Sequence, residues 1–354
     1  MRSIEQESFQ GKRVLVRCDF NVPLGDQGNI LDSLRIVSAH RTINFLIHQG
    51  AKVILMSHLG KPEGKVVERL RLNNVRSLLS ERLGIPVVKT EDCIGAAAEQ
   101  AVAAMKDGDV LLLENLRFHA EEEANSPEFG QQLARLGDRY VNEAFSVSHR
   151  AHASLVQIPK FLPAFAGFEL LEEVQALEPL LKDPAKPMIV VVGGTKVETK
   201  TDFLDTISNI ADTILVSNLI AEELESKSIY FKNIQKVLIP VDGNPGNGLN
   251  LDIGPRTIEL FCEVLKTAKT VFWSGPVGKI EEPAYEKGSL SIAQAIIASK
   301  AYSVAGGGDL NAFLHKKGLQ EKFSHMSTGG GALLAFLGGD KLPGLEALGY
   351  YDGN

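Results

Sequence analysis

The sequence contains no long apolar segment. No run approaches the roughly 18 apolar residues that a membrane-spanning helix needs. Runs such as Met188–Val192 and Val110–Leu113 instead have the length of buried β-strands. Residues 1–10 are polar and include the acids Glu5 and Glu7, so we expect no signal peptide. These absences predict a cytoplasmic protein without a membrane partner.

Cysteine is also scarce. Cys18, Cys93 and Cys262 lie far apart, which excludes a disulfide framework and fits a reducing cytosol. Neither Cys-x-x-Cys nor His-Glu-x-x-His occurs, so the sequence lacks the motifs of structural zinc sites and of zincin hydrolases. The absence of Gly-x-Ser-x-Gly removes the nucleophile elbow of the α/β-hydrolases.

An excess of positive charge is missing as well. The chain has 37 basic and 44 acidic residues, a formal net charge of −7, so we expect no nucleic-acid partner. Its 354 residues are enough for two domains of roughly 150 residues each. Of the 14 arginines, 13 lie at or before Arg150, whereas 22 of the 33 glycines follow it. The guanidinium group of arginine and the backbone N–H groups at glycines both bind anions. This division therefore indicates two domains that bind anions in different ways.

Short apolar runs alternate with helix-like stretches along the chain. The expected strands are Arg13–Cys18, Ala51–Met56, Val110–Leu113, Tyr140–Val141, Met188–Val192, Thr213–Val216, Lys236–Ile239, Thr270–Trp273 and Tyr302–Ala305. The expected helices are Ile36–His48, Leu72–Leu83, Ile94–Met105, Glu128–Leu136, Thr201–Ile210, Ile258–Leu265, Gly288–Ala298 and Leu310–Lys316. The alternation predicts an α/β fold with parallel sheets covered by helices, and a domain boundary near Pro159–Pro187 with a linking helix over Phe168–Leu181.

Three glycine clusters of the second half each join an apolar segment to the start of a helix. They lie within Val190–Lys200, Ser303–Asp309 and Ser327–Ala332. The free amides and the dipole of a helix N-terminus favour an anion such as a phosphate. Lys196 and Lys200 add positive charge to the first cluster, so the three clusters together predict a phosphate-binding site.

Two well-known phosphate-binding motifs are absent. The P-loop spelling Gly-x-x-x-x-Gly-Lys-Ser/Thr does not occur. Neither Gly-Gly-Gly cluster extends to Gly-x-Gly-x-x-Gly, because Asn311 and Leu334 occupy the third glycine position. A P-loop enzyme is therefore excluded, and a Rossmann dehydrogenase is disfavoured. Asp309 offers an oxygen ligand for Mg²⁺ beside the second cluster.

Polar and basic side chains of the first half follow the ends of the predicted strands. These segments are Asp19–Pro23, Ser57–Pro62, Glu114–His119, Asn142–Phe145 and His149–His152. Ligands of parallel sheets bind beyond the carboxyl ends of the strands, so we expect Arg35, Arg117 and Arg150 to converge on a small anionic metabolite. The acidic run Glu121–Glu123 is interpreted as a solvated turn or helix cap.

These motifs together resemble the phosphoglycerate kinase family over essentially the whole chain. The matching segments are DFNVP (19–23), Arg35, SHLGKP (57–62), LLLENLRF (111–118), VNEAFSVSHRAHAS (141–154), VVGGTKVETK (191–200), DIGP (252–255), SGPVGKIE (274–281), AGGGD (305–309), STGGGA (327–332) and LPGLEAL (342–348). So many colinear motifs make coincidence negligible.

The resemblance implies two Rossmann-like domains joined by a hinge helix. Residues 1–160 with the tail 341–354 would bind 3-phosphoglycerate, residues 161–187 would form the hinge, and residues 188–340 would bind the Mg-nucleotide. The implied reaction is reversible, in-line phosphoryl transfer on domain closure, in which 1,3-bisphosphoglycerate and ADP give 3-phosphoglycerate and ATP. A monomer is expected, with Mg²⁺ accompanying ATP or ADP.

The resemblance also implies roles for individual residues. The catalytic residues would be Arg35, Lys196, Lys200, Gly308 and Gly331. The substrate-binding residues would be Asp19, Phe20, Asn21, Arg35, His58, Leu59, Gly60, Lys61, Arg117 and Arg150. The nucleotide-binding residues would be Gly194, Lys196, Lys200, Pro276, Glu281, Gly306, Gly307, Gly308, Asp309 and Leu310, with Asp309 as the metal ligand.

Departures from the family pattern lie on the nucleotide side. Ser274, Lys279 and Leu310 replace the usual residues, and Ser217–Ile220 stands where the family has a glycine-rich loop. The chain is also short for the family, mainly between Ser217 and Lys236. The alternative function is therefore a non-catalytic relative that binds 3-phosphoglycerate and has an altered nucleotide pocket. A generic two-domain sugar or acid kinase is a third hypothesis.

Overall fold

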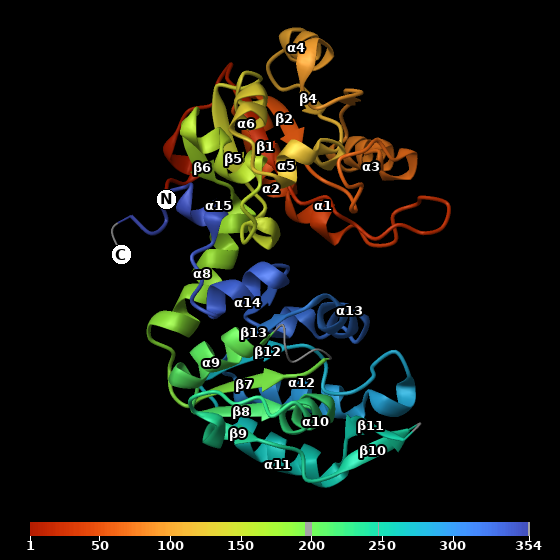
Figure 1. Ribbon diagram of the computed structural model, residues 1–354, viewed down its shortest axis with the longest axis vertical. Helices are drawn as coiled ribbons and strands as arrows, with labels where there is room; N and C mark the ends of the chain where they lie inside the picture. Colours follow the sequence, from red (N-terminus) through yellow and green to blue (C-terminus); the bar gives the residue numbers. More distant parts are fainter. Residues whose placement is uncertain (195–199, 247, 353–354) are drawn as a thin grey trace. The chain divides into compact units, whose positions relative to one another are not determined.

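The structure is a computed structural model, and it describes residues 1–194, 200–246 and 248–352. Internal contacts divide the chain into two units (Figure 1). Unit 1 comprises Met1–Glu173 and Lys341–Asn354, and unit 2 comprises Val174–Asp340. Within the described residues, no helix combines the length and the apolar character that crossing a membrane requires.

Unit 1 contains a six-stranded parallel sheet in the order β3-β4-β2-β1-β5-β6. The strands are β1 (Arg13–Arg17), β2 (Lys52–Met56), β3 (Val87–Lys89), β4 (Val110–Leu112), β5 (Arg139–Asn142) and β6 (Ala164–Ala166). The helices are α1 (Leu34–Ser38), α2 (His40–His48), α3 (Asn73–Leu83), α4 (Gly95–Ala103), α5 (Ala120–Glu123), α6 (Pro127–Ala134), α7 (Ala153–Val156) and α15 (Pro343–Glu346).

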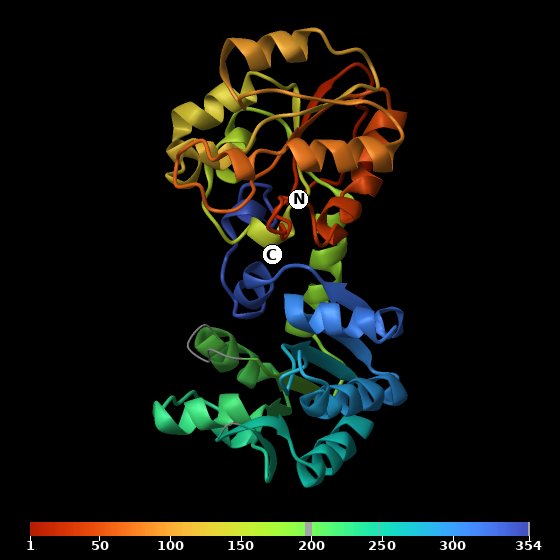
Figure 2. The same ribbon diagram turned by 90° about the vertical axis from the view of Figure 1, so that its right-hand side faces the viewer.

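Both faces of this sheet are covered by helices (Figure 2). On one face, Val14 of β1 belongs to a core with Ile43 of α2 and Leu79 of α3. Successive strand residues point to opposite faces, so Leu15 lies on the other face, and it is equally buried. Burial on both sides explains why the strands read as continuous apolar runs.

The C-terminal segment belongs to unit 1 although it follows unit 2 in the sequence. Gly344 N–H of α15 donates to Ser148 O at 2.8 Å, and the amino group of Met1 donates to Gly349 O at 3.2 Å. Both ends of the chain therefore contribute to the same unit.

Unit 2 contains a second six-stranded parallel sheet, in the order β14-β13-β12-β7-β8-β9. The strands are β7 (Met188–Val192), β8 (Thr213–Val216), β9 (Val237–Leu238), β12 (Thr270–Ser274), β13 (Tyr302–Gly306) and β14 (His325–Ser327), and β10 (Gly243–Gly246) and β11 (Leu249–Ile253) form a separate antiparallel pair. The helices are α9 (Thr201–Ile210), α10 (Asn218–Ser226), α11 (Pro255–Lys266), α12 (Lys287–Ser299), α13 (Gly308–Lys316) and α14 (Gly331–Leu337).

Helices cover both faces of the second sheet too (Figure 2). Trp273 of β12 is fully buried in a core with Phe261 of α11 and Ile292 of α12. On the opposite face, the Phe272 ring meets the Phe203 ring of α9 edge-on, with centroids 5.5 Å apart. The fold is therefore two parallel-sheet α/β units, as the sequence predicted.

Several elements differ from the sequence-based expectation. The helix expected over Ile36–His48 is two helices, α1 and α2, which meet at Ala39. The short strands β3, β6 and β14 and the β10–β11 pair were not expected. Three of these strands have only three residues, too few to show a hydrophobic period.

Helix α8 (Phe168–Lys182) runs from unit 1 into unit 2. Its first turn is held in unit 1, where Phe168 N–H donates to Thr42 Oγ1 at 2.9 Å and Glu169 N–H donates to Glu143 Oε1 at 3.2 Å. Glu143 is buried, and its desolvation raises the pKa of the carboxyl to about 8. The carboxyl is therefore largely protonated at neutral pH. A hinge role for residues 161–187 remains a prediction.

We expect Glu143→Gln to reduce the pH dependence of stability. The folded-state pKa of Glu143 exceeds the usual 4.5. Its contribution to the free energy of unfolding is therefore complete below the unfolded pKa and is lost as the pH rises towards about 8. Denaturant unfolding measured from about pH 5 to about pH 9 should show the variant gaining stability relative to the wild type as the pH rises. Glu99→Gln, at an exposed carboxyl on α4, is the control. Parallel curves for Glu143→Gln and wild type would contradict the assignment.

Candidate functional site

In unit 1, the carboxyl ends of four strands supply the predicted substrate-binding residues. Asp19 follows β1, His58 follows β2, Arg117 follows β4 and Arg150 follows β5. Strand β1 lies between β2 and β5, so the chain order of the sheet reverses beside β1. Ligands of open α/β sheets bind at such a reversal, outside the carboxyl ends of the strands.

Asp19 is the hub of one hydrogen-bond network. Arg35 Nη1 donates to Asp19 Oδ2, and the Ser146 hydroxyl donates to the same oxygen. The N–H of Asn21 donates to Asp19 Oδ1 at 3.1 Å, and Asn21 Oδ1 accepts from Gly60 N–H at 2.8 Å. The loops after β1, β2 and β5 are therefore tied together, and Arg35 of α1 is attached to them.

Two buried histidines lie among arginines in this region. His58 Nδ1 is 3.3 Å from Arg17 Nη2, and Arg17 Nε donates to Ser154 Oγ at 2.9 Å. Burial first, and then the nearby guanidinium groups of Arg17 and Arg117, hold the pKa of His58 well below its usual range. The same causes lower the pKa of His152 to about 3. Both imidazoles are therefore neutral at physiological pH, and the arginines carry the positive charge.

Arg117 is held so that part of its fork remains without a hydrogen-bond acceptor. Its Nη1 donates to Gly60 O at 2.8 Å, and its Nε lies 3.1 Å from Glu123 Oε1 without hydrogen-bond alignment. Arg117 Nε, Arg117 Nη2 and Arg150 Nε are buried donors that have no hydrogen-bond acceptor within the described part of the chain. Buried, unpaired donors are costly, and an anion with several oxygens would satisfy them.

A buried acid beneath these groups was missed by the sequence analysis. Glu122 is fully buried, and its carboxyl accepts from Ser154 N–H at 2.9 Å and from Ser154 Oγ at 2.6 Å. The interpretation of Glu121–Glu123 as a solvated run is therefore wrong at its middle residue. Burial raises the pKa of the Glu122 carboxyl, and the nearby Arg17, which also donates to Ser154, opposes this rise. An arginine at the end of an apolar strand was the signal that a buried acid is needed.

In unit 2, the loops after β7 and β12 meet where the strand order reverses. Gly193 N–H donates to Ser274 O at 2.8 Å, and Gly194 N–H donates to Pro276 O at 2.7 Å. A Cβ atom at Gly193 would lie 2.1 Å from Pro276 O, so only glycine fits there. The first glycine cluster is thus built into the predicted ligand-binding edge.

Lys200 lies beside this cluster as the residue that precedes helix α9. The side chain is buried, its ammonium group donates to Gly193 O, and burial lowers its pKa. Among the described residues its hydrogen-bond partner is Gly193 O, and an ammonium group has three donors, so donors remain for an anion. Lys196, predicted for the same site, lies outside the described residues.

The other two glycine clusters begin helices α13 and α14. Gly307 precedes α13 with φ +116°, a conformation that side chains rarely adopt. Asp309 is exposed in the first turn of that helix, whereas Leu310 is fully buried in the core. Asn311 Nδ2 donates to Ser327 O at 2.8 Å and so links α13 to the end of β14. Two helix N-termini therefore lie on neighbouring strand ends.

Two other predicted residues are exposed. Lys61 in unit 1 and Glu281 in unit 2 have exposed side chains. Near Glu281, Lys279 forms a surface ion pair with Glu282 at 2.5 Å. The buried parts of the two candidate regions are therefore the arginine-rich edge of unit 1 and the glycine–lysine edge of unit 2.

Comparison with known proteins identifies the family to which these two regions belong. The family profile described as phosphoglycerate kinase matches residues 4–230 and 219–340. A curated phosphoglycerate kinase from Pelotomaculum thermopropionicum is 41% identical over 388 residues, which cover 98% of each chain. The chain belongs to the phosphoglycerate kinase family. A relative from Synechococcus sp. with the same name is 42% identical over 395 residues and 98% of each chain.

Solved structures of phosphoglycerate kinases share the fold. The structure from Pyrococcus horikoshii OT3 matches with a TM-score of 0.88 at 31% identity and covers 100% of both chains. The structure from Coxiella burnetii matches with a TM-score of 0.83 at 32% identity and covers 99% of both chains. The similarity therefore extends over both units.

The comparisons also bear on the length of the chain. The alignments to phosphoglycerate kinases run over 388 and 395 residues, more than the 354 residues present here. The two parts of the family match overlap at residues 219–230. This overlap falls inside the segment from Ser217 to Lys236, where the sequence predicted much of the shortfall in length. Helix α10 and the turn after it occupy this segment.

Proposed function

We propose that this chain transfers a phosphoryl group reversibly between 1,3-bisphosphoglycerate and Mg-ADP, with 3-phosphoglycerate and ATP as products. The observation that carries the proposal is the set of unpaired, buried donors of Arg117 and Arg150 at the carboxyl edge of unit 1. These donors suit a small phosphorylated acid, in a chain whose relatives are named phosphoglycerate kinases.

The proposed acid-binding residues divide into charged side chains and loop groups. Arg117, Arg150 and Lys61 bind phosphate and carboxylate oxygens. Asp19, Asn21 and His58 orient the glycerate, and the Phe20–Asn21 and Leu59–Gly60 segments shape the loops around it. These loops are already fixed to one another, since Phe20 N–H donates to Ser57 Oγ at 2.8 Å and Leu59 N–H to Asn115 Oδ1 at 3.2 Å.

The proposed nucleotide-binding residues lie in unit 2. They are Gly194, Lys196, Lys200, Pro276, Glu281, Gly306, Gly307, Gly308, Asp309 and Leu310, with Leu310 restricted to its backbone because its side chain is buried. The exposed carboxylate of Asp309, which directly follows Gly306–Gly308, fits the oxygen donors that Mg²⁺ prefers. Asp309 would hold the ion, which would supply positive charge to the nucleotide phosphates.

The chemistry requires positioning and positive charge rather than a base. The acceptor is already anionic, whether it is the carboxylate of 3-phosphoglycerate or a β-phosphate oxygen of ADP. The barrier arises from charge crowding and alignment, which preplaced cations lower. Arg35 and Lys200 supply that charge from the two units, and the helix N-termini at Gly308 and Gly331 donate amides to phosphate oxygens. In-line transfer requires the two substrates to be brought together. Domain closure at the hinge is predicted to do this.

We expect Arg117→Lys to raise KM for 3-phosphoglycerate by about 10–100-fold, the cost of losing hydrogen bonds to a charged group. Lysine keeps the charge but lacks the fork whose Nη1 donates to Gly60 O and whose Nη2 remains for an anion. Initial rates at varied 3-phosphoglycerate measure the effect. Arg139→Lys, at an arginine paired with Glu7, is the matched control. Equal KM values for Arg117→Lys and wild type would remove Arg117 from the site.

Calorimetry and a turnover assay separate the proposed function from its alternative. The enzyme is expected to bind both Mg-ADP and 3-phosphoglycerate and to consume ATP only when 3-phosphoglycerate is present. A chain that binds 3-phosphoglycerate without binding Mg-ADP or turning over would be the non-catalytic relative. Consumption of ATP with another sugar or acid in place of 3-phosphoglycerate would identify a different kinase.

A further inference from the structure

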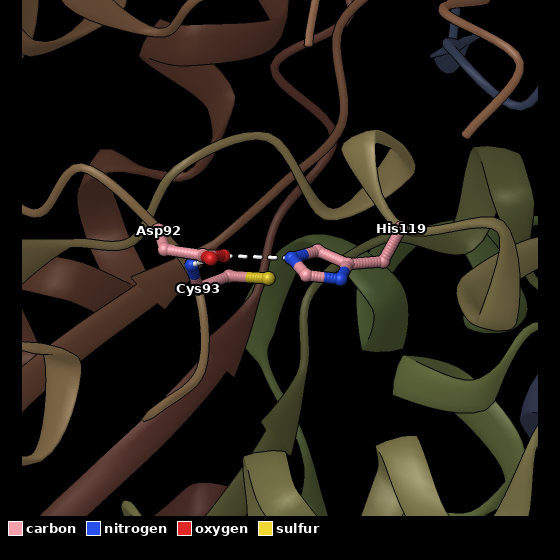
Figure 3. A group of neighbouring side chains, drawn as sticks. All are labelled: Asp92, Cys93 and His119. Carbon is pink, nitrogen blue, oxygen red and sulfur yellow. Dashed lines mark hydrogen bonds and ion pairs between the residues drawn. The ribbon is translucent and has the colours of Figure 1, made fainter. Parts of the chain in front are cut away.

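A separate group of side chains in unit 1 contains three metal-ligand types. Asp92 and Cys93 lie in the loop after β3, and His119 lies after β4, between a 3₁₀ turn (Leu116–Phe118) and helix α5. Strands β3 and β4 are parallel neighbours, so these loops leave the sheet at the same edge. Figure 3 shows the Asp92 carboxyl and the Cys93 sulfur side by side at the Nε2 edge of His119.

The three ligand atoms are close enough to share one cation. The carboxyl, thiol and imidazole atoms all lie within 4.8 Å of one another, and His119 Nε2 is 2.7 Å from Asp92 Oδ1. Cys93 N–H donates to Asp92 Oδ1 at 2.6 Å, and Thr90 Oγ1 donates to Asp92 O at 2.6 Å, which fixes the loop. The ligands are therefore held in place by the surrounding backbone.

We propose that Asp92, Cys93 and His119 form a binding site for Zn²⁺. Zinc takes sulfur, imidazole nitrogen and carboxylate oxygen in a tetrahedron, and three protein ligands with one water make a complete set. The side chains of Asp92 and His119 are 51% and 25% exposed, so the ion can enter from solvent, whereas Cys93 is buried and forms the floor. The bound ion replaces the thiol proton, which passes to solvent.

The surroundings favour a cation over a reactive thiol. Burial, and then the charges of Asp92 and Glu122, raise the pKa of the Cys93 thiol. A high pKa makes the free thiol a poor nucleophile. Zn²⁺ must displace the thiol proton on binding, and the Asp92 carboxyl beside the sulfur offers the ion a second ligand. The site differs from the proposed Mg²⁺ position at Asp309, because Mg²⁺ prefers oxygen ligands alone. Its ligands come from two loops 26 residues apart in sequence, so a search for short motifs does not find them.

Titration of the full chain with Zn²⁺ and Co²⁺ tests the proposal. We expect one equivalent of Zn²⁺ to bind and to raise the thermal unfolding temperature. Co²⁺ should give a thiolate-to-cobalt charge-transfer band that Zn²⁺ abolishes. Cys93→Ser and His119→Gln should each weaken Zn²⁺ binding by more than about tenfold. Loss of a hydrogen-bond partner of a ligand already lowers metal affinity by about that factor, and loss of the ligand itself should cost at least as much.

Matched controls keep the test decisive. Cys262→Ser and His48→Gln alter a cysteine and a histidine outside the cluster and should leave affinity and spectrum unchanged. Asp92→Asn should also weaken Zn²⁺ binding. Because this substitution changes an exposed side chain and keeps its shape, the loss of binding cannot be assigned to unfolding. Absence of Zn²⁺ binding, or binding with a cobalt band that survives Cys93→Ser, overturns the site. Neither result bears on the kinase assay, which needs no zinc.

Discussion

Arg35→Ala is expected to lower kcat by at least about 100-fold, the usual cost of removing one group that stabilises charge in a transition state. The affinity for Mg-ADP should remain nearly unchanged, because Arg35 belongs to unit 1. Arg35 is held by Asp19 Oδ2 and by Asn21 O at 3.4 Å, so its guanidinium is positioned before substrate binds. Steady-state kinetics, with calorimetry for Mg-ADP, measure the two effects separately.

Arg41→Ala is the matched control for Arg35. Arg41 lies one helix later in the chain, pairs with Glu172 and covers the Phe168 ring, and its side chain is largely exposed. Its removal should leave kcat close to that of the wild type. If Arg35→Ala retains wild-type turnover, Arg35 does not contact the transferred group.

Lys200→Ala should lower kcat by about 100–1,000-fold, with a smaller change in KM for ATP. The buried ammonium group donates to Gly193 O and faces the loop that begins the proposed phosphate site. In this enclosed position a charge acts on developing phosphate charge more strongly than it would in water. Stopped-time product measurements at saturating ATP would report the loss of kcat.

Lys236→Ala tests whether any half-buried lysine of unit 2 has this effect. Its ammonium group donates to Ser208 O and Ala211 O, both at 2.8 Å, near the end of helix α9. Loss of Lys236 should reduce stability and leave kcat unaltered. A Lys200→Ala variant with a raised KM and normal kcat would limit Lys200 to ground-state binding.

The fold could be predicted because its strands are buried on both faces. The continuous apolar runs Val14–Val16 and Met188–Val192 lie in β1 and β7, in the middle of the two sheets. A parallel sheet brings all carboxyl ends to one edge. The residues that follow β1, β2, β4 and β5 were therefore predicted to lie together without knowledge of any contact. Their roles in binding remain predictions.

Features that depend on partners distant in sequence could not be predicted. The burial of Glu122 depends on Ser154 and Arg17, which belong to other elements. The Cys93–His119 neighbourhood likewise depends on the register of β3 against β4, and β3 is only three residues long. Sequence patterns report local periodicity, whereas these contacts are set by the tertiary packing of short segments.

The most direct test of the central claim is a coupled assay of the wild-type chain with 3-phosphoglycerate and Mg-ATP. The proposed function predicts ADP formation that requires both 3-phosphoglycerate and Mg²⁺ and that is lost in Arg35→Ala. An intact wild-type chain that binds 3-phosphoglycerate but forms no ADP with it would contradict the claim of phosphoryl transfer.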